Sequence, residues 1–118
     1  MDESGNIAMG YSVARDPGVF PGLRYVGREA SDPAGVMSTA ETTLVDGASS
    51  QNGADRWGDY FGMGVDPDDG CTFWFAGMYM PSGGSWRNRV AAFPDIGCET
   101  APGDPNRPDV QDERQAAE

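Results

Sequence analysis

The chain has 118 residues, 38 % of them hydrophobic, with 17 glycines and 9 prolines; this length and composition fit one small domain of short strands joined by tight turns. Its formal net charge is −11, from 19 acidic residues against 8 basic ones, all of which are arginine. Nucleic acids and anionic membranes attract basic proteins, so neither is an expected partner of this acidic chain.

Six segments carry the β-branched and aromatic residues of short strands, and no helical period is found before residue 100. In chain order these segments are residues 6–14, 23–30, 41–46, 59–65, 71–80 and 87–93. The stretches between them are rich in Asp, Gly, Pro and Ser, which favour turns. This pattern predicts an antiparallel all-β domain over residues 1–98. Residues 99–118 contain no aromatic residue, and we expect a disordered, acidic, Pro-rich tail there.

The chemistry open to this chain is narrow, because histidine is absent. Ser-His-Asp and Cys-His catalysis and His-ligated zinc are excluded, which leaves carboxylates, arginines, tyrosines and hard metals such as calcium. Cys71 and Cys98 are the only cysteines and have no CxxC spacing. One structural disulfide of a secreted protein fits them, and two reduced, buried thiols are the alternative.

Targeting signals and membrane spans are not apparent. No segment is long and apolar enough to span a membrane, so no membrane insertion is expected. The first residues, MDESG, do not form a signal peptide. If the protein is exported, we expect its export signal to lie outside this chain.

A weak internal repeat suggests the architecture. Gly5 and Gly70 each end an acidic turn that leads into a strand with Met or aromatic residues. Segment 23–30 then aligns with segment 87–93, whereas segment 41–46 has no second copy. A repeat of four strands has the size of a β-propeller blade, so the chain would hold about one and a half blades. Chance similarity between two strand–turn–strand pieces is the alternative.

The most specific motif is DPDDGCTF, residues 66–73. Short Asp side chains accept hydrogen bonds from nearby backbone N–H groups, and Gly takes the positive φ of a tight corner. The motif residues are Asp66, Asp68, Gly70, Thr72 and Phe73. They resemble the Asp-box (BNR repeat) of sialidase-type propellers, Ser-x-Asp-x-Gly-x-Thr-Trp, with Asp66 in place of Ser, Phe73 in place of Trp, and Trp74 one position later.

The resemblance to these secreted bacterial propellers covers residues 2–98 and is most specific where RWGDY is followed by VDPDDGCTFW. It implies antiparallel four-stranded blades, with the Asp-box as a structural outer corner and the chain as the carboxy-terminal part of a larger propeller. Calcium at Asp66 and Asp68 is the metal alternative. With Asp69 these residues supply few oxygens, and the glycine does not stand in EF-hand order, so we expect no cofactor.

Arg56, Trp57, Asp59 and Tyr60 form the candidate ligand-binding group. They enter the strand predicted to be innermost in the second blade, where propellers bind ligands. Arg binds carboxylate or sulfate groups through two hydrogen bonds, and Trp offers an apolar face to a sugar ring. Asp59 and Tyr60 are also the catalytic candidates, as acid or base and as proton donor. The alternative is that Arg56 pairs with Asp59 or Asp55 while Trp57 packs between blades.

An active sialidase uses three arginines around the substrate carboxylate and a Tyr–Glu nucleophile pair. Arg24, Arg28 and Arg56 are the arginine candidates, but the sequence offers no convincing Tyr–Glu pair. Met78 precedes Tyr79 where the sequences that it resembles have Glu, and Glu41 is expected to face solvent. Arg87 and Arg89 share one strand face and are interpreted as solvated residues or as an anion contact.

The sequence therefore predicts a fragment of an exported, extracellular or cell-surface sialidase-like propeller that binds glycans or proteins and is not active alone. A glycoside hydrolase with most of its catalytic residues outside this chain is the alternative, and a truncated gene without an independent role is a third possibility. The expected partners are the remaining blades, with glycans or cell-surface proteins as ligands. A fold of this kind does not decide between binding and catalysis.

Overall fold

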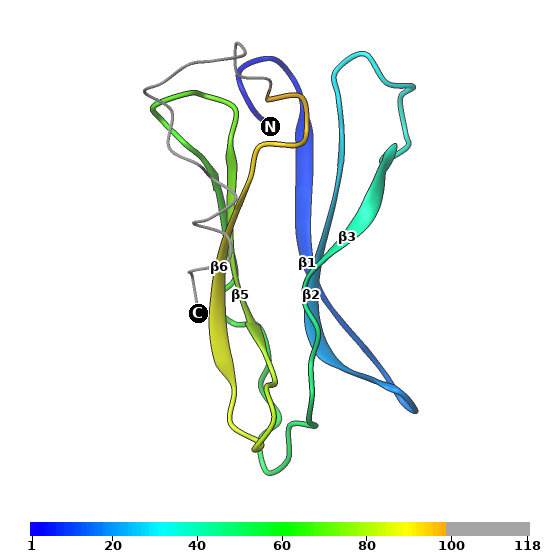
Figure 1. Cartoon of the computed structure of the whole chain (residues 1–118), viewed down its shortest axis with the longest axis vertical. Coiled ribbons are helices and arrows are strands. Elements are labelled where there is room, and N and C mark those ends of the chain that lie inside the picture. The colour runs from blue at the N-terminus through cyan, green and yellow to red at the C-terminus, as the bar shows by residue number, and fades with distance from the viewer. Residues whose placement is uncertain (99–118) are drawn as a thin grey trace.

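The computed structural model describes residues 1–98, which form two three-stranded antiparallel sheets (Figure 1). The first sheet contains β1 (Ile7–Arg15), β2 (Val19–Arg28) and β3 (Thr39–Val45). The second contains β4 (Gly62–Val65), β5 (Phe73–Tyr79) and β6 (Arg87–Phe93). The all-β antiparallel prediction is confirmed, and each of the six predicted segments overlaps one strand. The predicted tail at residues 99–118 lies outside the described residues.

Two strands begin three or more residues away from the predicted start. β2 starts at Val19 rather than at residue 23, because Val19 pairs with Arg15 and so extends the β1–β2 hairpin. β4 starts at Gly62 rather than at residue 59, because Asp59 and Tyr60 form a turn before the strand. The candidate ligand-binding group therefore lies in a loop at the edge of the second sheet instead of inside a strand.

The core lies between the two sheets, which face each other along their length (Figure 1). Alternate residues of β5 are buried, as expected for a strand with one face against another sheet. The Tyr25 ring stacks on Phe93 with centroids 4.0 Å apart, and its hydroxyl donates to Asp95 Oδ2 over 2.5 Å. The buried core cluster consists of Leu23, Tyr25, Phe73, Phe75, Tyr79, Phe93 and Ile96.

Glycines on the inner faces allow the two sheets to approach closely. A Cβ atom added to Gly10 of β1 would lie 2.5 Å from the ring of Phe75 on β5. Gly77 of β5 packs closely against Leu23 of β2, since a Cβ atom added to Gly77 would lie only 2.9 Å from the leucine side chain. Phe75 and Leu23 thus each pack over a glycine of the facing sheet.

Similar acidic corners precede β1 and β5, which agrees with the internal repeat. In the first, Asp2 Oδ1 accepts from Ser4 N over 2.9 Å, and Gly5 N donates to Asp2 O over 3.2 Å. In the second, Asp66 Oδ1 accepts from Asp68 N over 2.9 Å, and Gly70 N donates to Asp66 O over 2.8 Å. Both glycines have positive φ, +89° and +67°. The corners before β1 and β5 thus share an aspartate that accepts from the backbone and a closing glycine with positive φ, although the glycine follows the aspartate by three residues in the first and by four in the second.

No helix in residues 1–98 has the length and apolarity that a membrane span requires.

Candidate functional site

The acidic corner at residues 66–72 is held by its own carboxylates. Asp69 Oδ1 accepts hydrogen bonds from Cys71 N and Thr72 N over 2.9 and 2.8 Å, and Asp69 Oδ2 accepts from the Thr72 hydroxyl over 2.5 Å. Asp66 Oδ2 accepts from the Trp74 indole over 3.1 Å. These bonds organise the backbone in the way that the motif predicts for a structural corner.

The calcium candidates Asp66 and Asp68 are not gathered into a cation site within residues 1–98. The group of three potential metal ligands found there consists of Asp69, Cys71 and Cys98 instead. The two cysteines form a disulfide with Cα atoms 5.1 Å apart. This pairing agrees with the predicted disulfide, which joins the corner to the segment that follows β6.

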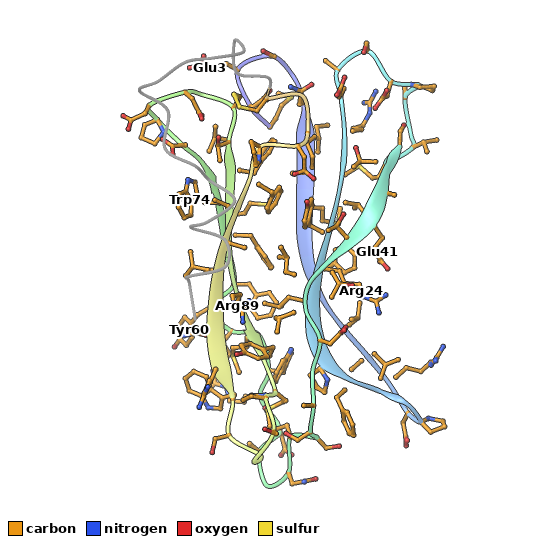
Figure 2. The ribbon with its side chains drawn as sticks, in the orientation of Figure 1. Glu3, Arg24, Glu41, Tyr60, Trp74 and Arg89 are labelled. Atoms are coloured by element: carbon orange, nitrogen blue, oxygen red, sulfur yellow. A yellow bond between two sulfur atoms is a disulfide. The ribbon has the colours of Figure 1, made fainter. Side chains whose placement is uncertain are left out.

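All four candidate ligand-binding residues line one cleft of about 460 Å³. The floor of the cleft is the outer face of the second sheet, where Ala76 and Met78 of β5 lie across from Val90 and Asn88 of β6. The loop at residues 51–60 forms one wall, and Trp86 from the β5–β6 connection forms part of the rim. Figure 2 shows Tyr60 on this side of the second sheet, away from the first sheet. The cleft contains Arg56, Trp57, Asp59, Tyr60, Ala76, Met78, Trp86, Asn88 and Val90.

The loop around the cleft is held by a few polar contacts. Gln51 Nε2 donates to the carbonyl oxygens of Ala54 and Arg56 over 3.0 and 2.8 Å. The Trp57 indole donates to the Ser12 hydroxyl on β1 over 3.4 Å. The bond to Ser12 connects Trp57, which lines the cleft, to the first sheet.

Arg56 and Asp59 form an ion pair with Nη2 and Oδ2 2.6 Å apart, which is the pairing considered as the alternative to ligand binding. The Arg56 side chain is 82 % exposed. An ion pair so open to water contributes only about 0–1 kcal/mol. Arg56 is therefore free to exchange Asp59 for a carboxylate or hydroxyl group of a ligand at little cost.

Exposed aromatic rings mark the mouth of the cleft. Tyr60 is 88 % exposed and Trp86 is 56 % exposed, although side chains of this size are usually at least partly covered. Sequence reasoning missed Trp86 and Asn88. The available signal was a tryptophan directly after the Gly-rich turn PSGGS, where a strand hairpin holds it in solvent.

A second hollow of about 540 Å³ adjoins the cleft and shares Gln51 and Trp57 with it. Its remaining lining comes from the β1–β2 hairpin and includes Arg15, Asp16 and Phe20. Trp57 therefore stands between two concave surfaces, each of which combines an aromatic side chain with an arginine and an aspartate.

A different polar cluster occupies the outer face of the first sheet, where Figure 2 shows Arg24 and Glu41. Glu41 Oε1 lies 2.6 Å from Arg24 Nη1, and Glu41 Oε2 accepts a hydrogen bond from the Tyr11 hydroxyl. The pKa of Tyr11 is raised to about 12, mainly by burial and next by the hydrogen bond to Glu41. The hydrogen bonds from Tyr11 and Arg24 lower the pKa of Glu41. The sequence did not reveal this Tyr–Glu pair. Glu41 is exposed, as expected, but its carboxylate binds Tyr11 and Arg24.

The three arginine candidates have different partners. Arg24 binds Glu41, Arg28 donates to the backbone carbonyl of Asp32, and Arg56 pairs with Asp59. In β6, the Arg89 guanidinium lies 5.5 Å from the centre of the Tyr79 ring and is half-buried. Arg89 thus packs on an aromatic residue, while Arg87 is exposed.

Comparison of the chain with protein-family models, with curated proteins and with solved structures found no match. The resemblance to sialidase-type propellers therefore stays a prediction that rests on the motifs of the sequence.

Proposed function

We propose that this chain is a glycan-binding module made from blades of an exported sialidase-like β-propeller, and that the cleft beside residues 51–60 holds the glycan. The observation that carries the proposal is the composition of the cleft. Trp57, Tyr60 and Trp86 offer ring faces to the C–H groups of a sugar, and the cleft volume of about 460 Å³ is that of a small-molecule site. Arg56 and Asn88 supply hydrogen-bond donors for hydroxyl or carboxylate groups.

The polar groups of the cleft favour recognition over catalysis. Asp59, one of the two catalytic candidates, is bound to Arg56 in the open loop. The other, Tyr60, extends into solvent. A general acid needs a raised pKa and a fixed position, and burial is the usual source of both. The cleft supplies contact surface and hydrogen bonds, which suit a binding site.

Two features support the propeller origin. In the acidic corners before β1 and β5 an Asp side chain accepts from the N–H two residues on and its carbonyl accepts from the closing glycine, and the two sheets pack face to face, as successive blades do. One further strand beside β1 and one beside β6 would complete two four-stranded sheets, and the remaining blades are the proposed source of these strands. The disulfide supports an extracellular or cell-surface location, since such bonds persist in oxidising compartments.

A part of a glycoside hydrolase is the second candidate function, and the Tyr11–Glu41–Arg24 cluster is the observation that favours it. The pKa values of this cluster make hydrolysis the less favoured of the two candidate functions. Because the pKa of Tyr11 is raised to about 12, the phenol stays protonated at neutral pH. The lowered pKa of Glu41 makes this carboxylate a weak base for removing that proton.

The test is a screen of the 118-residue chain against neutral, sialylated and sulfated glycans, followed by titration of the best ligand into three variants. Trp57→Ala and Trp86→Ala should each weaken binding at least tenfold, because aromatic residues dominate binding energy at such surfaces. Tyr11→Phe, on the other sheet, is the control and should bind as the wild type does. Equal affinities for all variants, or no bound glycan, would refute the proposal. If the wild type releases a terminal sugar from the glycan and Tyr11→Phe does not, the hydrolase is favoured.

A further inference from the structure

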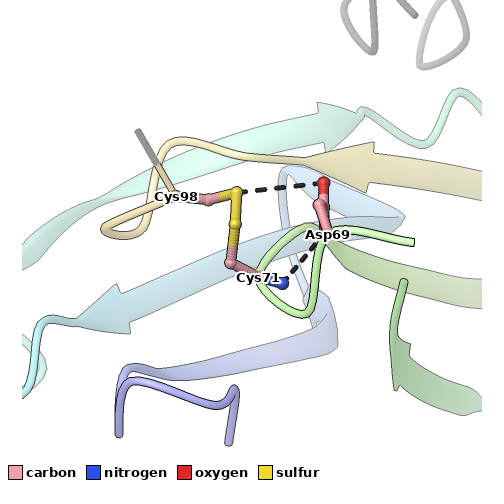
Figure 3. A group of neighbouring side chains, drawn as sticks. All are labelled: Asp69, Cys71 and Cys98. Carbon is pink, nitrogen blue, oxygen red and sulfur yellow. Dashed lines mark hydrogen bonds between the residues drawn. A yellow bond between two sulfur atoms is a disulfide. The ribbon is translucent and has the colours of Figure 1, made fainter. Parts of the chain in front are cut away.

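Asp69, Cys71 and Cys98 converge at the corner before β5, on a part of the molecule separate from the glycan cleft (Figure 3). A carboxylate oxygen of Asp69 and the two sulfur atoms all lie within 4.8 Å of one another. The two sulfur atoms are this close because they are bonded to each other, and the Asp69 carboxylate lies beside that bond. In the structure the sulfurs are bonded to each other, so the donors become available only when that bond is reduced.

The backbone holds both cysteines in place by contacts other than the disulfide. Cys71 N donates to Asp69 Oδ1 over 2.9 Å, and Cys71 precedes a threonine that is fully buried at the start of the sheet. Cys98 N donates to Pro94 O over 3.2 Å, and the nearby Ile96 is buried in the core. These contacts hold the backbones of the two cysteines, whose Cα atoms lie 5.1 Å apart, independently of the S–S bond.

The Asp69 carboxylate is oriented toward the same point. Two backbone N–H groups bind its Oδ1, and its Oδ2, which also accepts from the Thr72 hydroxyl, lies 4.0 Å from Cys98 Sγ. Tetrahedral zinc, with Zn–S near 2.3 Å and Zn–O near 2.0 Å, places sulfur and oxygen ligands about 3.5 Å apart. A shift of a few tenths of an ångström would bring Asp69 and Cys98 to that separation, while the two sulfur atoms, once reduced, must move apart to about 3.8 Å through rotation of the cysteine side chains.

We propose that the reduced form of this corner is a metal site in which the Cys71 and Cys98 thiolates and the Asp69 carboxylate bind one zinc-like divalent cation, with water as the fourth ligand. A dithiol or phosphine reductant supplies two electrons, the S–S bond breaks, and two protons give two thiols while the reductant is oxidised. Cation binding then displaces those two protons. Thiolates favour zinc or cadmium over calcium and magnesium.

The consequence is that the corner can be cross-linked in two ways. Under oxidising conditions a disulfide joins Cys71 to the segment after β6, and under reducing conditions a bound cation makes the same connection. A site of this kind links the stability of the corner to both the redox state and the supply of metal.

The test is a titration of the phosphine-reduced 118-residue chain with cadmium, followed by thiolate-to-cadmium charge-transfer absorption. One cadmium should bind per reduced chain and none to the oxidised chain at the same concentrations. Asp69→Asn should weaken binding at least tenfold, because the amide keeps the acceptor for the two N–H groups but loses the charge. Asp68→Asn is the matched control in the same turn and should stay within twofold of the wild type.

The double variant Cys71→Ser/Cys98→Ser should give no charge-transfer band. Equal cadmium affinity of Asp69→Asn and Asp68→Asn would overturn the proposed ligand set. The absence of saturable one-to-one binding to the reduced wild type would overturn the site as a whole. Reduction that abolishes the β-sheet circular dichroism, with no recovery on adding cadmium, would do the same.

Discussion

The indole Nε1 of Trp74 donates a hydrogen bond to Asp66 Oδ2 over 3.1 Å and so connects β5 to the first residue of the acidic corner. Neighbouring residues of a strand point to opposite faces. Phe73 accordingly enters the core, where its ring lies 6.0 Å from that of Phe93, while Trp74 lies on the outer face (Figure 2). Phe73 and Trp74 thus divide packing and hydrogen bonding between them.

Asp66→Ala should destabilise the protein by about 1–2 kcal/mol, because it removes the acceptors of Asp68 N and of the half-buried Trp74 indole. Urea unfolding followed by tryptophan fluorescence measures this loss. Asp68→Ala is the control, since its exposed side chain makes no hydrogen bond or ion pair within residues 1–98, and its effect should stay within about 0.5 kcal/mol. Equal losses for both variants would show that the corner does not depend on Asp66.

Gly10→Ala should destabilise the protein by about 1–3 kcal/mol, because the added methyl group would lie 2.5 Å from the Phe75 ring in the core between the sheets. Gly62→Ala in β4 is the matched control, since nothing lies within 4 Å of its added methyl group. Thermal unfolding of the two variants compares them. A Gly10→Ala protein as stable as Gly62→Ala would contradict the face-to-face packing of the sheets.

Tyr11 should titrate at about pH 12, above its usual pKa of 10.0. Because folding raises this pKa, the stabilisation from Tyr11 is present below pH 10 and is lost as the pH rises through 12. The pKa of Glu41 is lowered instead, so its contribution is present above its usual value of 4.5 and is lost as the pH falls through the lowered value.

Glu41→Gln tests this coupling, because the substitution removes the negative charge that helps to keep the Tyr11 proton in place. The pKa of Tyr11 should fall in this variant, as measured by ultraviolet absorbance of tyrosinate or by NMR of the ring carbon next to the hydroxyl. Glu29→Gln, in the loop after β2, should leave it unchanged. A pKa of Tyr11 that stays at about 12 in Glu41→Gln would mean that burial alone raises it.

Loss of the disulfide should cost about 3.5 kcal/mol in metal-free solution, as the chain-entropy model gives for cysteines 27 positions apart. Cys71→Ser/Cys98→Ser, compared with the oxidised wild type in urea unfolding, measures this difference. A loss below about 1 kcal/mol would mean that the unfolded chain is already restricted near the corner.

The strands and the corner could be predicted because their signals are local. Alternating aromatic residues mark β5, and Asp66 and Gly70 mark the turn before it. The Tyr11–Glu41 contact could not be predicted, because it joins residues 30 positions apart through the registers of two strand pairs. The β2–β3 pairing also contains register shifts, which no local pattern reveals.

The part of the candidate site that is local in sequence could also be predicted. Arg56, Trp57, Asp59 and Tyr60 are neighbours in sequence, and they line one cleft. Trp86 and Asn88 reach that cleft only because the β5–β6 hairpin folds back across the sheet. Their place in the cleft depends on strand pairing, so the sequence pattern around them carried little information about it.

The most direct measurement is an NMR titration of the isotope-labelled 118-residue chain with the best glycan from the screen. The glycan proposal predicts saturable shift changes at the amides of residues 51–60 and 86–90 and at the indole N–H groups of Trp57 and Trp86, with little change at Tyr11 or Glu41. Shift changes centred on the Tyr11–Glu41 face, or a spectrum that no glycan alters, would contradict it.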